Sequence, residues 1–188
     1  MHRFFASSCL ALLIFLAASI SAKSQKYDHF EVENNDLFWR YTYEYRGLKD
    51  SLRREVVQIL KSKFFTFTVT RNETGYSGEI KYYKLECKKY GRTYLNTPRM
   101  YWDGEWTGKF YIDIADNIYT VTIYALYYEK MQRTSDYYRT EKAVKGRYVD
   151  AVLKKGKTDF KKNELVNMDM MGLGFKDEFD IKNTFQIH

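Results

Sequence analysis

The sequence predicts an α+β fold in which one principal helix packs on one face of an antiparallel β-sheet. Three patterns indicate this fold: an alternating aromatic run at residues 37–45, an amphipathic stretch at 50–63, and two alternating runs that meet at a polar turn. Side chains of a strand alternate with a period of two, whereas those of a helix repeat every 3.6 residues. The predicted order is β-α-β-β-β-β, followed by a helical C-terminal appendage.

The first predicted strand leads directly into the principal helix. Apolar and aromatic side chains fall on one face of this strand: Leu37, Trp39, Tyr41, Tyr43 and Tyr45. Gly47 ends the strand, and Asp50 or Ser51 supplies an N-cap for a helix that runs to Lys63. Because the helix has a single apolar stripe, we expect it to pack against the sheet. The stripe consists of Leu52, Val56, Ile59 and Leu60.

Two further strands are predicted after the helix. Residues 65–70 alternate aromatic or apolar side chains with threonine, and residues 80–88 form the next strand. The polar segment 72–78 contains two glycines and predicts the turn between them. Cys87 alternates with apolar neighbours, so we expect it to be a small buried side chain.

The clearest hairpin comes next. Residues 90–108 contain the chain's only proline and are predicted to be irregular. The alternating runs 110–114 and 118–128 then follow, joined by Asp116 and Asn117. Such runs on either side of a tight turn predict two antiparallel strands.

The C-terminal part has weaker patterns. Residues 130–145 are polar and are expected to form an extended loop, and residues 147–153 fit either a strand or a helix. Residues 159–171 are predicted to be helical, with Gly172 as the C-terminal stop. A short docking element is expected to follow, built on Phe175, Phe179 and Phe185.

The start of the chain has the pattern of a secretory leader. A basic start precedes the uncharged apolar run 4–20, and small residues follow. Two cleavage positions are possible, after Ala22 or after Ser24. Cleavage after Ser24 is preferred, because the two recognition positions, Ala22 and Ser24, are then both small. Gln25 would be the new N-terminus. An uncleaved anchor helix is the alternative, since a membrane span needs about 17–25 residues.

Three segments are therefore expected. They are a signal peptide (1–24), an α+β domain (25–129) and a C-terminal loop and helical extension packed on that domain (130–188). The predicted mature chain keeps only Cys87, so it forms no internal disulfide and depends on its core for stability. The formal net charge of +7 is scattered without a basic stripe, which indicates a solvated surface. A leader that exports the chain argues against a nucleic-acid partner.

The order of these elements resembles an uncharacterised family of exported bacterial proteins whose domain has a TATA-binding-protein-like fold. The resemblance covers residues 38–129. It rests on the aromatic first strand, the helix at 50–63, a glycine turn at 75–78 and the hairpin at 108–123. It implies the fold and no activity, because the family has none established, and the name of the fold implies no DNA binding.

The sequence lacks the residues that several common kinds of site require. Beyond the leader, histidine occurs only at His29 and His188, near the two ends of the mature chain. A nucleophilic triad needs a positioned imidazole, and a zinc site needs several His or Cys ligands. Neither common phosphate-binding glycine loop is present. We therefore predict no catalytic residues, no cofactor and no metal.

Residues 102–106, Trp-Asp-Gly-Glu-Trp, are the strongest local candidate for a site. Trp102 and Trp106 would form a sugar-stacking surface, or Asp103 and Glu105 would act as a glycosidase-like acid pair. The structural alternative is an Asp-Gly turn whose tryptophans cover the sheet edge. Binding is favoured over catalysis, because nothing in the sequence desolvates one carboxylate relative to the other.

We therefore expect a non-catalytic, secreted or periplasmic module that binds a protein or glycan of the cell envelope. One alternative is a glycan-acting hydrolase that uses Asp103 and Glu105. Another is a structural or assembly subunit with an aromatic interface, since the chain has 18 tyrosines and 13 phenylalanines. A sheet rich in its preferred residues is the favoured explanation of these aromatics. No stable membrane span is expected after leader removal.

Overall fold

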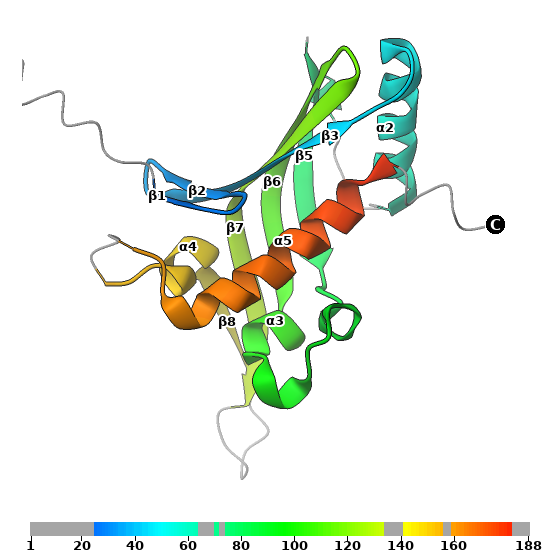
Figure 1. Ribbon diagram of the computed structural model, residues 1–188. Coiled ribbons are helices and arrows are strands. Elements are labelled where there is room, and N and C mark those ends of the chain that lie inside the picture. The colour runs from blue at the N-terminus through cyan, green and yellow to red at the C-terminus, as the bar shows by residue number, and fades with distance from the viewer. Residues whose placement is uncertain (1–24, 64–69, 72–73, 134–140, 156–158, 182–188) are drawn as a thin grey trace, which may run out of the picture.

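The structure is a computed structural model that describes residues 25–63, 70–71, 74–133, 141–155 and 159–181. The predicted leader and its cleavage position after Ser24 lie outside the described residues, as does most of the strand predicted at 65–70. Among the residues that are described, eight strands form one antiparallel sheet (Figure 1). The predicted α+β class with an antiparallel sheet is confirmed.

The sheet has the order β1-β2-β3-β7-β6-β5-β4, and β8 pairs with the distal part of β7. The strands are β1 (Gln25–Tyr27), β2 (Phe30–Glu33), β3 (Asp36–Glu44), β4 (Thr70–Arg71), β5 (Gly75–Tyr83), β6 (Glu105–Ala115), β7 (Ile118–Arg133) and β8 (Glu141–Arg147). The α-helices are α2 (Lys49–Lys63), α3 (Arg99–Trp102), α4 (Tyr148–Val152) and α5 (Leu165–Phe179). Short 3-10 helices are η1 (Cys87–Tyr90), η2 (Tyr94–Asn96) and η3 (Lys162–Glu164).

One face of the sheet, here called the inner face, carries the core. Trp39 of β3 and Phe110 of β6 both lie opposite Ile123 of β7, so these side chains share one face. All three are fully buried. Helix α2 and the β6–β7 hairpin form as predicted, and the apolar stripe of α2 is buried in the same core.

Helix α5 lies across the inner face (Figure 1) and continues past the predicted stop. That prediction was wrong because Gly172 and Gly174 provide room for close packing. A Cβ on Gly172 would lie 3.4 Å from the Trp39 indole nitrogen, and one on Gly174 would lie 2.5 Å from Leu85 Cδ1. The helix thereby buries five large side chains: Met168, Met170, Met171, Phe175 and Phe179. The C-terminal helix is thus part of the core.

Tyrosines of the sheet hold the end of α5. Tyr43 donates a hydrogen bond to the carbonyl of Lys176, and Tyr119 donates one to the carbonyl of Phe179, each at 2.9 Å. The last carbonyls of a helix have no partner within the helix, so these hydroxyls supply hydrogen bonds to two of them. Burial raises the pKa of Tyr43 well above its usual range, which keeps its hydroxyl a donor.

The turn predicted at 72–78 is largely strand. Residues 75–78 belong to β5, because Gly75 lets the backbone of β6 approach closely: a Cβ there would lie 1.8 Å from the Ile112 carbonyl oxygen. The strand predicted at 80–88 ends at Tyr83. Cys87 begins η1 instead, although it is buried as expected.

The C-terminal predictions need two further corrections. Residues 130–145 do not form a single extended loop, because β7 continues to Arg133 and β8 pairs with it from Glu141 onward. The domain boundary expected at residue 129 therefore falls inside a strand. Most of the segment left open at 147–153 forms α4, and Arg147 belongs to β8.

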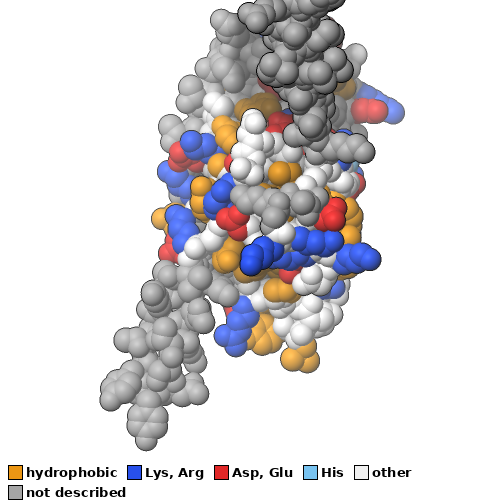
Figure 2. Space-filling model, turned by 90° about the vertical axis from the view of Figure 1, so that its left-hand side faces the viewer, with side chains coloured by type: hydrophobic (Ala, Val, Ile, Leu, Met, Phe, Trp, Pro, Cys, Tyr) orange, Lys and Arg blue, Asp and Glu red, His pale blue; other side chains and the backbone are white. Residues whose placement is uncertain are grey.

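The opposite face, here called the outer face, is polar and aromatic, and the described helices pack on the inner face. On the outer face Phe38 stacks on Tyr124 with ring centroids 5.6 Å apart, and Arg40 pairs with Glu31 at 3.0 Å. On the side of the molecule that carries β1, β2 and α4, basic and acidic side chains lie interspersed (Figure 2). The surface charge is therefore mixed, as the sequence suggested.

Candidate functional site

The structure separates the two tryptophans of the predicted site. Trp106 lies in β6 with 0% of its surface exposed, packed against Tyr101, Tyr128 and Tyr148. Trp102 ends α3 and is only half-buried. Residues 102–106 therefore form no shared platform on which a sugar could stack between two indoles.

The two predicted carboxylates lie in ordinary polar surroundings. Asp103 is exposed at the C-cap of α3, where its backbone N–H donates to the carbonyl of Arg99 at 2.9 Å. Glu105 pairs with Lys84 at 2.9 Å and keeps 39% of its side chain exposed. A hydrolytic acid pair needs one carboxylate in a desolvated environment, so this geometry does not favour the hydrolase hypothesis.

Between these acids the chain reverses at Gly104. A Cβ at this position would lie 2.0 Å from the carbonyl oxygen of Met100. The close approach lets α3 turn directly into β6, and it accounts for the glycine on structural grounds.

Residues 84–104 connect β5 to β6 and contain η1, η2 and α3; this segment is here called the excursion. Its first part is fastened to α5 through Asp177. Lys89 Nζ lies 2.8 Å from the Asp177 carboxylate, and the Tyr90 hydroxyl donates to the same carboxylate at 2.9 Å. The Asp177 hydrogen bond raises the pKa of Lys89, which keeps this contact charged.

A buried polar network fastens the second part of the excursion to the start of α5. The Tyr101 hydroxyl donates to Glu164 Oε2 at 3.0 Å, and Asn167 donates to the same oxygen at 3.2 Å. Arg92 completes the link by donating to Asn167 Oδ1 at 3.2 Å. Burial raises the pKa of Tyr101 well above its usual range, so its hydroxyl stays protonated. Hydrogen bonds at both Tyr101 and Asn167 therefore fix how the excursion packs on the start of α5.

Cys87 ties the two ends of the excursion together. Its thiol donates to the carbonyl of Tyr101 at 3.3 Å, and burial raises the pKa of this thiol. The thiol therefore acts as a structural hydrogen-bond donor, and its environment does not activate it as a nucleophile.

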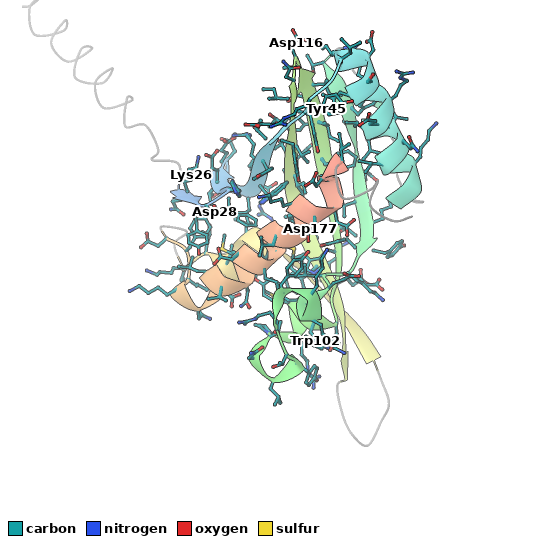
Figure 3. The ribbon with its side chains drawn as sticks, turned by 45° about the vertical axis from the view of Figure 1, so that its right-hand side comes forward. Lys26, Asp28, Tyr45, Trp102, Asp116 and Asp177 are labelled. Carbon is teal, nitrogen blue, oxygen red and sulfur yellow. The ribbon has the colours of Figure 1, made fainter. Side chains whose placement is uncertain are left out.

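A hollow of about 370 Å³ opens between η1 and α3. It is lined by Leu85, Glu86, Cys87, Lys88, Lys89 and Trp102. Trp102 lies at the opposite end of the molecule from the β6–β7 turn at Asp116 (Figure 3). Because Tyr101 points into the core and Trp102 lines the hollow, the buried network also positions the indole.

Aromatic and apolar side chains continue beside this hollow. Tyr94 contacts Trp102 edge-on with ring centroids 5.8 Å apart, and the Arg99 guanidinium lies 5.9 Å from the Tyr94 ring. Tyr94 is 46% exposed and Leu95 is 96% exposed. We call the group of Lys88, Tyr94, Leu95, Arg99 and Trp102 the Trp102 surface.

Sequence reasoning identified only Trp102 of this surface. The remaining members come from a segment without periodicity, so no pattern indicated which of them face solvent. The cluster of basic and aromatic residues at 88–99 was the available signal. No group of three or more His, Cys, Asp or Glu residues that could hold a metal occurs in the described part of the chain.

Two solved structures are similar to this chain. One is a TBP-like protein from Parabacteroides distasonis, with a TM-score of 0.45 and 16% identity over 80% of this chain and 94% of that chain. The other is a DUF4468 family protein from Bacteroides ovatus, with a TM-score of 0.40 and 11% identity over 81% of this chain and 91% of that chain. Both descriptions name the class of protein that the sequence resembles, and neither states an activity. No family model and no curated protein matches the chain.

Proposed function

We propose that this protein is a non-catalytic binding module of the cell envelope whose Trp102 surface holds a segment of another protein. The observation that carries the proposal is the contrast within the excursion. Its inward-facing side chains are fastened to α5 and the core, while Tyr94 and Leu95 are exposed and Trp102 is half-buried beside a hollow. Exposed aromatic anchors next to a pocket are typical of protein interfaces.

The exposed side chains support a protein ligand over a glycan at this position. Leu95 is aliphatic and almost fully exposed, and an aliphatic side chain gains most by contact with apolar groups of a partner. Lys88 and Arg99 form no ion pair within the described residues, so they are available to carboxylates. The matching partner segment combines apolar side chains with Asp or Glu.

Substitution of Trp102 tests the binding proposal. We expect Trp102→Ala to raise the dissociation constant for the partner at least tenfold, because an interface anchor is lost. A tenfold rise is a loss of about 1.4 kcal/mol in binding free energy. The partner is first captured from the native envelope on the immobilised mature chain. It is then purified and titrated by calorimetry against the wild type and the variants.

The matched control is Ile118→Ala. Ile118 is also an exposed apolar residue (38%), and it adjoins the turn at Asp116, far from Trp102 (Figure 3). This variant should bind as the wild type does. Equal affinity of wild type and Trp102→Ala, with both chains folded, contradicts the proposal.

The envelope location rests on the leader pattern of residues 1–24. We expect fractionation to find the chain outside the cytoplasm, and intact mass and N-terminal sequencing to give Gln25 as its first residue. A mature chain that still carries Met1 contradicts cleavage. Among the described residues, no helix is both long enough and apolar enough to cross a membrane.

A further inference from the structure

Three neighbouring strands are irregular at the same level of the sheet. The pairing of β5 with β6 shifts register between Ile80 and Tyr83, and that of β6 with β7 shifts between Thr107 and Lys109. Ala125 of β7 has a positive φ of 50° at this level. Bulges of this kind redirect side chains and are over-represented next to functional sites.

Tyr82, next to the irregularity in β5, also has a positive φ. Its φ is 56°, a region that large side chains rarely occupy. Burial of the ring does not offset this strain, because 67% of Tyr82 is exposed. The fold therefore holds an aromatic ring in solvent at an energetic cost, which is the pattern expected where strain serves a site.

The irregular strands enclose a hollow of about 370 Å³ on the outer face. Gly108 lies in its lining, where a Cβ would come within 2.9 Å of Leu126 Cδ2 and 3.3 Å of the Tyr124 carbonyl oxygen. The side chains around the hollow include Glu79, Tyr82, Lys109, Tyr127, Glu129 and Lys145.

Hydrogen-bond donors and acceptors are nearly balanced around this hollow. Three lysines line it together with two glutamates. Lys81 pairs with Glu79 at 3.2 Å, and the Lys145 ammonium lies 5.9 Å from the Tyr127 ring. A polyanion would meet the two carboxylates, and an apolar helix would have to desolvate five charged groups. The charges therefore disfavour both kinds of ligand.

We propose that this hollow binds a ring of an uncharged oligosaccharide. Sugar hydroxyls both donate and accept hydrogen bonds, which matches alternating ammonium and carboxylate groups. The C–H face of a sugar ring packs on an aromatic ring, and Tyr82 and Tyr127 offer such rings at the hollow. The site is separate from the Trp102 surface and does not depend on it.

The test uses the mature chain on an array of uncharged oligosaccharides built from glucose, mannose, galactose and N-acetylglucosamine. Titration follows with the best-retained compound. We expect binding that changes little between low and high salt, since no net charge is neutralised. Absence of retention on every uncharged compound, or retention of acidic glycans alone, overturns the proposal.

Substitutions of Tyr82 make the test specific. Tyr82→Gly removes the ring and suits the positive φ, so the melting temperature should not fall, whereas oligosaccharide affinity should drop at least tenfold. Tyr82→Phe keeps the ring and should bind within threefold of the wild type. Undiminished binding by Tyr82→Gly overturns the proposal. Trp102→Ala should keep full oligosaccharide binding, so a failure of one site is distinguishable from a failure of the other.

Discussion

Trp106→Ala is expected to lower the free energy of unfolding by about 3–5 kcal/mol. The indole is fully buried, and its ring centroid lies 5.0 Å from that of Tyr148, 5.6 Å from Tyr101 and 5.7 Å from Tyr128. Truncation removes this buried surface and leaves a cavity between β6, β7, α3 and α4. Equilibrium urea unfolding measures the loss.

Two control variants test whether lost packing causes the loss of stability. Trp106→Phe should cost far less, because it keeps a ring and removes an indole N–H that has no hydrogen-bond partner among the described residues. Trp102→Ala should cost clearly less than Trp106→Ala, since that ring is only partly buried where it packs against the core. A cost for Trp106→Ala no greater than that for Trp102→Ala would show that the core is not organised as described.

Gly75→Ala is expected to cost at least about 3 kcal/mol, the upper end of the range for overpacking. The added Cβ would lie 1.8 Å from the Ile112 carbonyl oxygen and 3.3 Å from the Asp113 Cα. Backbone atoms of a central strand cannot rotate away as a side chain can, so β5 and β6 must separate. The hydrogen bond from the Ile114 N–H to the Thr74 carbonyl, 3.0 Å in the wild type, should be lost with them.

Hydrogen exchange of the Ile114 amide and urea unfolding together check this expectation. Gly91→Ala is the control, because a Cβ there meets no atom within 4 Å. Gly91 has a φ of 70°, so its substitution costs only the backbone strain of about 1–2 kcal/mol. Protection of Ile114 that is unchanged in Gly75→Ala would rule out the proposed clash.

Two glycines that sequence reasoning misread, and a third that it did not consider, share one property. Gly75 was expected in a turn and Gly172 at a helix stop, and Gly174 was not considered, yet each lies inside a regular element. In each case the missing side chain makes room for a segment distant in the sequence: β6 for Gly75, Trp39 for Gly172, and Leu85 for Gly174. A local sequence pattern predicts turns and helix ends from the flexibility of glycine. It does not indicate where the small size of glycine allows a distant segment to pack closely.

The candidate site shows the same division. Trp102 and Trp106 are four residues apart in one motif, so the sequence treated them alike. At Gly104 the chain changes from helix to strand, so that one ring enters the core and the other lies half-buried beside the hollow. Only the contacts that fasten the excursion to α5 show that the Trp102 surface also includes Tyr94, Leu95 and Arg99.

Periodicity along the chain was enough to place β3, α2 and the β6–β7 hairpin, because each is defined by the alternation of neighbouring side chains. The length of α5, the strand character of residues 75–78 and the exposure of Trp102 were set by packing between distant segments. Close packing depends on the atoms that meet in space, and a linear pattern carries no record of which atoms those are.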